Sequence, residues 1–179
     1  NKSMEKVLGD LGCGLDATFA HIRTRETNCS NWICDCVRDG MFSLGCNVDM
    51  VLLNAGTLRA DDVFPPGPFL MRDLVTLLPM LDELCVLKMT GVQVHEALEN
   101  SVSQYPKMEG RFPCISGFSF AFDPLCLPSR RVDFSSVTVR GEPLDPKKEY
   151  HVVTKAYLAS GKDGYAVFQQ CPMVSDSEE

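Results

Sequence analysis

The clearest structural signal in this chain is the segment Val48-Asp-Met-Val-Leu-Leu-Asn54-Ala-Gly56-Thr-Leu-Arg59. An apolar run from Val48 to Leu53 predicts a buried strand, and the small residues that follow predict a turn at its end. The Asn54 amide, the open backbone at Gly56 and the Arg59 guanidinium can then face one ligand. Because amide and guanidinium N–H groups are donors that suit an anion, the segment predicts an anion site where the strand ends.

Helix and strand signals alternate after this segment and before it. Thr27 or Asn28 is expected to cap a helix that ends at Gly40 or Gly45. Its apolar face comprises Trp32, Ile33, Cys36, Val37 and Met41. A second helix is expected over Phe69–Leu78 and a strand over Glu83–Met89. The capping-box spacing of Thr90 and Gln93 then starts a helix, whose inward residues are Val94, Ala97, Leu98 and Val102.

The two ends of the chain carry further element signals. At the start, Met4–Leu11 is expected to be a short helix and Ala17–Ile22 extended, and residues 61–68, with three prolines, are expected to form a loop. Later strands are expected over Gly117–Asp123 with a core stripe of phenylalanines, over Ser136–Arg140 before a turn at Gly141, and over Glu149–Lys155. The stripe is Phe118, Phe120 and Phe122, and the inward face of the last strand is Tyr150, Val152 and Thr154. This mixture predicts a single α/β domain of the α+β type, with helices packed on a mixed sheet.

Charge and composition exclude several classes of function. The net charge of −7 over 179 residues argues against general nucleic-acid binding, which needs a basic face. No apolar run approaches the roughly 20 residues of a membrane span. The three histidines are isolated and no CxxC pair occurs, so Cys34-x-Cys36 is a weak metal signal and no metal site is expected. Nine cysteines is an odd count, and most lie in apolar stretches as small core residues.

Three polar segments are candidates for one ligand site. They are Arg23–Asn28, where an expected strand passes into a helix, Asn54–Arg59, and Ala156–Gly164, an expected loop that follows the last strand. Each lies where a regular element ends, which is where binding groups are usually carried on a rigid scaffold.

The order of the motifs resembles the C-terminal domain of the 5′-nucleotidase and UDP-sugar hydrolase family. RTRETN precedes a helix that contains ICD, NAGTLR stands for the family's NGGGIR, and LLP precedes a strand that leads into KMTG. A Gly-Phe strand and an aromatic residue before GKDG complete the series. The resemblance covers about Arg23 to Phe168.

The resemblance implies a division of labour between two domains. Family members carry an N-terminal metallophosphoesterase domain with two divalent metal ions, such as Zn or Mn, and the C-terminal domain binds the nucleotide. The metal-binding motifs do not occur in this sequence, so this chain alone is not expected to hydrolyse phosphate esters, and no cofactor is expected in it. The implied ligand is a nucleoside monophosphate or a related nucleotide.

The same resemblance assigns roles to seven positions. Arg23, Asn54, Gly56 and Arg59 fall on the phosphate and ribose side, Tyr157 stacks on the base, and Asp163 accepts the ribose hydroxyls. Met80 occupies the place of the second aromatic wall, where a thioether gives a softer contact. Ala55 and Thr57 replace two glycines of the family motif. Cys34 matches one half-cystine of the family, while Val51 occupies its partner's position.

Each of these residues also has a plainer interpretation. Arg23 can be a solvated strand end, Asn54 a turn cap, Tyr157 a core aromatic, and Asp163-Gly164 an ordinary turn. The departures at Met80, Ala55 and Thr57 favour a non-catalytic interaction or regulatory module that keeps the fold, and a general α/β interaction domain without a ligand is a third reading.

The domain boundaries and the compartment are expectations of the same kind. Residues 1–22 are expected to be a lead-in after an N-terminal catalytic domain absent from this sequence. Residues 23–171 form the 5′-nucleotidase C-terminal-like domain, and residues 172–179 an acidic tail. The unpaired-looking cysteines lean toward the cytoplasm, although family members are commonly extracellular or periplasmic, so the sequence leaves the compartment open.

Overall fold

A mixed four-stranded sheet forms the centre of the molecule. In the computed structural model, which describes residues 2–174, the strand order is β6 (Leu84–Thr90), β11 (Glu149–Lys155), β3 (Met50–Asn54) and β7 (Pro113–Ser116). β11 runs parallel to β3 and antiparallel to β6, and β7 runs antiparallel to β3. The two inner strands are buried at nearly every position, and β3 accordingly carries a continuous apolar run rather than alternation.

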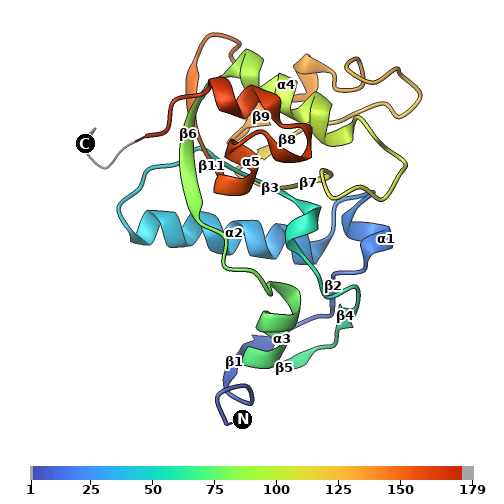
Figure 1. The fold of residues 1–179 in the computed structure, drawn as a ribbon, viewed down its shortest axis with the longest axis vertical. Helices are drawn as coiled ribbons and strands as arrows, with labels where there is room; N and C mark the ends of the chain where they lie inside the picture. Colours follow the sequence, from blue (N-terminus) through green and yellow to red (C-terminus); the bar gives the residue numbers. More distant parts are fainter. Residues whose placement is uncertain (1, 175–179) are drawn as a thin grey trace.

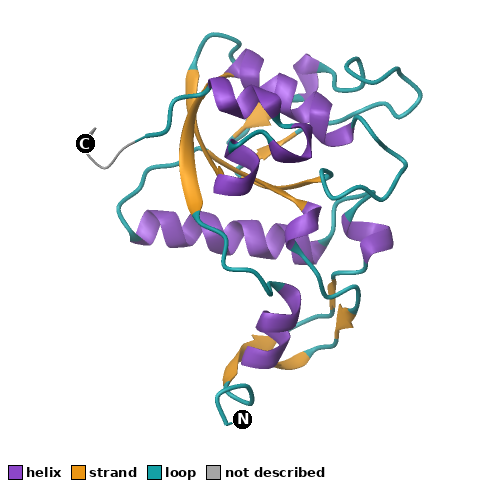
Figure 2. Ribbon diagram, viewed as in Figure 1, coloured by secondary structure: helices purple, strands orange, loops and turns teal. Residues whose placement is uncertain are grey.

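Helices cover both faces of this sheet, as Figures 1 and 2 show. α2 (Asn28–Ser43) packs against β3 and β7 on one face, while α4 (Gly91–Val102) and α5 (Ala156–Ala159) pack on the other. Thr27 caps α2, since its side chain accepts a hydrogen bond from the Ser30 amide. The Thr90–Gln93 capping box starts α4, as predicted.

An appendage projects from the sheet domain at the N-terminal end (Figure 1). β1 (Val7–Leu11) pairs with β5 (Gly67–Leu70), and β2 (Leu15–Asp16) pairs with β4 (Val63–Phe64), so the start of the chain lies against residues 63–70. α3 (Met71–Leu77) follows β5. Backbone pairing thereby joins two segments of the appendage that are distant in the chain.

Short elements complete the chain. α1 (Phe19–Ile22) precedes α2, and the 3₁₀ turn η1 (Ala55–Thr57) follows β3. A small antiparallel sheet contains β8 (Phe118–Ser119), β9 (Thr138–Val139) and β10 (Glu142–Pro143), with η2 (Phe134–Ser136) before β9. The last 3₁₀ turns are η3 (Lys162–Gly164) and η4 (Ala166–Gln170).

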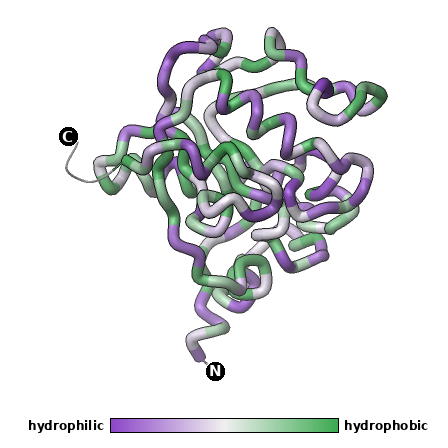
Figure 3. Tube along the Cα trace, turned by 45° about the horizontal axis from the view of Figure 1, so that its top comes forward, coloured by the Kyte–Doolittle hydropathy of each residue, from purple (hydrophilic) through white to green (hydrophobic). Residues whose placement is uncertain are grey.

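The hydrophobic residues gather in the sheet and on the faces of the helices that cover it. Figure 3 shows apolar segments concentrated in the middle of the trace. The inward residues predicted for α4, namely Val94, Ala97, Leu98 and Val102, are all buried. The predicted phenylalanine stripe packs against the core half-buried: Phe118, Phe120 and Phe122.

The fold class, the main helices and the strands β3, β6 and β11 agree with the sequence prediction, but several local predictions were wrong. The expected helix over Met4–Leu11 is largely strand β1, since residues 7–11 pair with β5. The expected extended segment Ala17–Ile22 contains the helix α1. The expected loop over residues 61–68 contains β4 and the start of β5. Strand β7 was not predicted.

Three further predictions need partial correction. On α2, Cys34 is buried, whereas Cys36, expected on the apolar face, is exposed. Only Phe118–Ser119 of the expected strand Gly117–Asp123 is regular strand. Residues 172–174 of the expected acidic tail pair with the outer edge of β6, through hydrogen bonds from the Lys88 amide to the Pro172 carbonyl and from the Val174 amide to the Val86 carbonyl. The remainder of the tail, residues 175–179, lies outside the described residues.

Candidate functional site

Three chain-distant segments meet where β3 and β11 end. Because these two strands are parallel neighbours, their carboxyl ends lie at one edge of the sheet, the usual place for a ligand crevice in such sheets. β3 ends at Asn54 and continues into η1, while β11 ends at Lys155 and continues into α5 and η3. The expected loop 156–164 is therefore two short helical turns, which carry Tyr157 and Asp163.

The Asp163 carboxylate joins the segments. The Asn54 amide nitrogen Nδ2 donates to Asp163 Oδ2 at 2.7 Å, and the Tyr157 hydroxyl donates to Asp163 Oδ1 at 3.1 Å. Asn54 is only 3% exposed, and its other side-chain atom, Oδ1, accepts a hydrogen bond from the Thr57 hydroxyl at 2.8 Å. Burial and the Asp163 carboxylate raise the pKa of Tyr157, so its hydroxyl keeps the proton that it donates.

The backbone around Asp163 is held in an unusual conformation. Asp163 has a φ of +53°, in the left-handed region that few non-glycine residues adopt. Its carbonyl accepts a hydrogen bond from Asn100 Nδ2 at 3.1 Å, and Arg111 donates to Asn100 Oδ1 at 3.2 Å. A Cβ on Gly164 would lie 2.4 Å from Asn100 Oδ1, so only glycine fits beside this support. Asn100, near the end of α4, thus stabilises the turn that carries the Asp163 carboxylate.

Gly56 is required for close approach rather than for a left-handed backbone. A Cβ at this position would stand 2.9 Å from Asn54 Nδ2 and 3.4 Å from the Cα of Gly110. The Gly56 amide donates to the Gly110 carbonyl at 2.9 Å. Residues 55–57 form the 3₁₀ turn η1, and no left-handed residue occurs there among the described residues. Ala55 and Thr57 can therefore replace glycines without backbone strain.

Arg23 and Arg59 bring positive charge to the candidate site. Arg23 ends α1, lies with its guanidinium carbon 4.0 Å from the centre of the Phe19 ring, and donates to the Met108 carbonyl at 3.2 Å. Burial lowers the pKa of Arg23, and the positive charge of Arg59 lowers it further, while Asp61, Glu109 and Asp163 oppose that shift. The two guanidinium groups are therefore electrostatic neighbours, and Arg59 is exposed.

Met80 lies in the connection between α3 and β6, at 49% exposure. This connection is fixed to the end of β11 because the Ala156 amide donates to the Glu83 carbonyl at 2.9 Å. Tyr157, one residue beyond Ala156, is 44% exposed. Both expected walls of the base slot thus carry accessible side chains on segments that are joined to each other.

Sequence reasoning missed the residues that support the site from behind: Asn100, Gly110, Arg111 and Thr57. Each acts on a segment far away in the chain, except Thr57.

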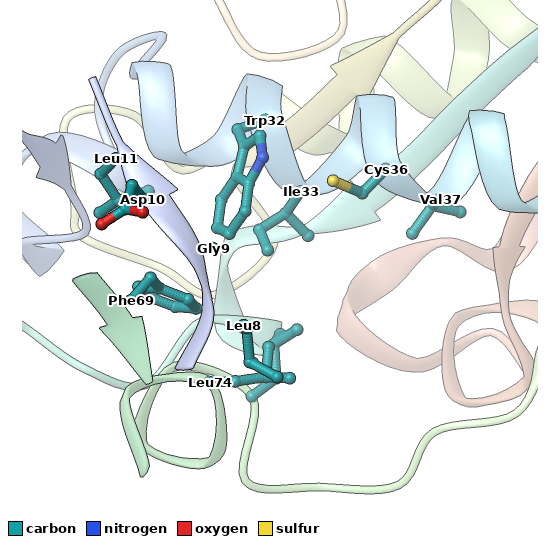
Figure 4. Close-up of a pocket in the computed structure, with 11 residues that line it drawn as sticks. Leu8, Gly9, Asp10, Leu11, Trp32, Ile33, Cys36, Val37, Phe69 and Leu74 are labelled. Carbon is teal, nitrogen blue, oxygen red and sulfur yellow. The ribbon is translucent and has the colours of Figure 1, made fainter. Parts of the chain in front are cut away.

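A separate cavity lies between the appendage and α2. Figure 4 shows Trp32 and Ile33 of α2 pointing toward Leu8, Phe69 and Leu74 across it. The cavity has a volume of about 410 Å³, and its lining is almost wholly apolar. None of the seven predicted site residues lines it, so it is distinct from the candidate site at the sheet edge.

The cysteines and histidines do not assemble into a metal centre. All nine cysteines fall within the described residues and all are free thiols. Burial raises the pKa of Cys29 to about 12 and that of Cys114 to about 11, so both remain protonated. Over residues 2–174, no group of three or more His, Cys, Asp or Glu side chains is arranged to hold an ion. Nor does this part of the chain include a helix long and apolar enough to cross a membrane.

Comparisons with known proteins place this geometry in a family. The profile described as "5′-nucleotidase, C-terminal domain" matches residues 7–170. The chain is 30% identical over 172 residues to the trifunctional nucleotide phosphoesterase YfkN of Bacillus subtilis, covering 93% of this chain and 11% of that protein. It is 36% identical over 129 residues to the NAD 5′-nucleotidase of Haemophilus influenzae, covering 68% of this chain and 21% of that protein.

A solved structure agrees with the sequence matches. The crystal structure of a 5′-nucleotidase precursor from Thermus thermophilus superimposes with a TM-score of 0.88 at 31% identity, over 98% of this chain and 34% of that one. The chain therefore spans only a small part of the relatives that it matches. From the profile match, the identities and the shared fold, this chain belongs to the 5′-nucleotidase C-terminal domain family.

Proposed function

We propose that this chain binds a nucleoside monophosphate or a related nucleotide, and that it holds the base and ribose while a separate N-terminal metallophosphoesterase domain of the same polypeptide hydrolyses the phosphate ester. One observation carries the proposal. The Asp163 carboxylate is oriented by Asn54 and Tyr157, which come from element ends 109 and 6 residues away in the chain.

The ribose and base would meet Asp163 and Tyr157. A carboxylate offers about four lone-pair sites, of which the two bonds described here use two, so the others remain for ribose hydroxyls. The Tyr157 hydroxyl bond fixes the ring while leaving it 44% exposed. An exposed ring of fixed orientation can stack on a base, a contact worth about 1–3 kcal/mol in nucleic-acid complexes.

The phosphate would meet Arg23 and Arg59. Two guanidinium groups in mutual repulsion gain from an anion placed between them, and the fork of N–H donors matches phosphate oxygens. Arg23 Nε is buried and has no hydrogen-bond partner. A buried donor without a partner is costly, and a ligand oxygen would relieve that cost.

The hydrolytic metal ions do not fit the described part of this chain. Its three histidines are already engaged: His21 with Asp16, His95 with the Val132 carbonyl, and His151 with the Asn47 carbonyl. No alternative cluster of ligands exists among the described residues. We therefore assign two divalent ions and the chemical step to the separate domain, and substrate binding to this one.

Isothermal titration of the 179-residue chain with adenosine, AMP and ribose 5-phosphate tests the proposal. The wild type is expected to bind all three, AMP most tightly because it engages both sides of the site. Asp163→Ala should weaken the binding of all three ligands, because each carries ribose. Asp39→Ala, which removes a carboxylate of α2 remote from the site, should leave all three affinities unchanged. Absence of binding up to millimolar concentration would refute the proposal.

A non-catalytic interaction or regulatory module is the second candidate. Met80, exposed where the family carries an aromatic wall, is the feature that favours it. Correctly folded wild-type protein that binds no nucleoside or nucleotide would support this reading.

A further inference from the structure

Lys155 is a buried cation beside the proposed base slot. It is the last residue of β11, is 2% exposed, and donates from Nζ to Asp82 Oδ2 at 2.9 Å. Its ammonium also lies 5.2 Å from the centre of the Tyr157 ring, over the ring face. One side chain thus contacts both the residue proposed to stack on the base and the connection that carries Met80.

The Lys155–Asp82 ion pair joins two segments that are far apart in the chain. Asp82 lies two residues after Met80, in the connection between α3 and β6. The pair stands next to the backbone hydrogen bond from Ala156 to Glu83, and the register pairs Lys155 with Leu84. Through these contacts residues 82–84, directly after Met80 and Leu81, are held to the end of β11.

Because Lys155 is buried, breaking this ion pair is energetically costly. An ammonium removed from water is stable only with a well-placed counter-charge, since a lost partner leaves an uncompensated buried charge. Asp82 remains about one-quarter exposed at its side chain, so it is the more accessible half of the pair. The ammonium also occupies one face of the Tyr157 ring, and a base can therefore stack only on the other face.

We propose that Lys155 and Asp82 are positioning residues that set the spacing between the Met80 side and the Tyr157 side of the base slot. This inference rests on the function proposed above. Because Met80 gives a softer wall than an aromatic ring, affinity for the base depends on holding that wall at a fixed distance. The affinity for ligands without a base should not depend on the Lys155–Asp82 ion pair.

Adenosine and ribose 5-phosphate separate these effects in a titration. Asp82→Asn keeps an acceptor for Lys155 but removes the counter-charge, and Lys155→Met combined with Asp82→Asn removes both charges. Each variant should lose about tenfold or more in adenosine affinity, a size set by one base-stacking contact, with less than about a twofold change for ribose 5-phosphate. Lys155→Arg, which preserves the ion pair, should retain most of the adenosine affinity.

Two controls keep the test decisive. Neutralising the exposed Arg72–Glu5 pair with Arg72→Met and Glu5→Gln should leave both affinities unchanged. If Asp82→Asn does not fold, because it leaves the buried Lys155 ammonium without a counter-charge, the double variant still tests the proposal, and Met80→Ala at an exposed position provides a second readout. Met80→Ala should weaken adenosine binding in the wild type and have a smaller effect in the double variant.

The outcomes distinguish the two proposals. Wild-type binding with unchanged adenosine affinity in Asp82→Asn, or equal losses for adenosine and ribose 5-phosphate, would overturn the positioning role and leave the proposed function standing. Wild-type protein that binds neither ligand would overturn both.

Discussion

Replacing Asn54 by Asp would set a second carboxylate against Asp163 and should destabilise the protein in a pH-dependent way. The side chains have the same shape, but the donor at 2.7 Å becomes a second acceptor. Loss of a hydrogen bond to a charged group costs about 1.5–3 kcal/mol. Two full charges repel by about 4 kcal/mol at 4 Å in an effective dielectric of 20, and partial exposure of Asp163 reduces this to about 2 kcal/mol.

The expected loss at neutral pH is therefore about 3.5–5 kcal/mol, which lowers Tm by roughly 7–20 °C for a domain of this size. Two carboxylates in contact raise the pKa of one of them above the unfolded value of about 3.9. Between those two values the folded state binds more protons than the unfolded state, so stability falls as pH rises. Relative to the wild type, Asn54→Asp should thus be least impaired at the acidic end of the pH range and most impaired above the raised pKa.

Thermal melts followed by circular dichroism from pH 4.5 to pH 8 measure this dependence. The matched control is the exchange Asn54→Asp with Asp163→Asn, in which an amide again faces a carboxylate, and it should recover most of the lost Tm at pH 7. A loss that is the same at every pH, or an exchange variant no better than Asn54→Asp alone, would refute the inference that the two side chains are in contact.

Three further expectations concern the ligand, a close approach and the thiols. Arg59→Ala should weaken the binding of AMP about 10- to 100-fold, the size of a lost charge-assisted hydrogen bond, and leave the affinity for adenosine unchanged. Equal losses of affinity for both ligands in a titration would contradict a phosphate role for Arg59. Gly56→Ala should lower the free energy of unfolding, measured in urea, by about 1–3 kcal/mol, because the new Cβ would stand 2.9 Å from Asn54 Nδ2. The matched control Gly40→Ala, whose Cβ meets nothing within 4 Å in α2, should stabilise by about 0.5–1 kcal/mol, and a similar result for both variants would contradict the packing. In native protein a thiol reagent should modify the exposed cysteines at once and the buried cysteines only on unfolding, and early reaction of the buried set would contradict their burial. The exposed set is Cys13, Cys36 and Cys126, and the buried set is Cys29, Cys34, Cys114 and Cys171.

Local signals in the sequence predicted the elements that depend on local chemistry. The Thr27 cap, the Thr90–Gln93 capping box and the continuous apolar run before Asn54 each act within a few residues, and the structure contains all three. The start of the chain was misread because residues 7–11 become a strand only by pairing with residues 67–70. No property of Met4–Leu11 alone carries that information. α1, four residues long, is too short for a periodic pattern to appear.

In the candidate site too, residues within sequence motifs could be predicted, whereas residues that act through contacts across the fold could not. Motif order pointed to Asn54, Tyr157 and Asp163, and the structure brings these three together by hydrogen bonds. Arg23, Arg59 and Gly56 lie around them, while Met80 is linked to them only through its backbone segment. The supporting residues Asn100, Gly110 and Arg111 could not be predicted, because their role depends on contacts across the fold.

The place of β11 in the chain has a consequence for synthesis. This central strand joins β6 to β3, yet it begins only at residue 149. A nascent polypeptide whose β3 and β6 have already left the ribosome still lacks the strand that lies between them. Asn54 likewise lacks its hydrogen-bond acceptor until Asp163, 109 positions downstream, has been synthesised. Closing so long a loop is slow. The candidate site should therefore form only after this segment has been translated, and any truncation before Glu149 should yield a chain without it.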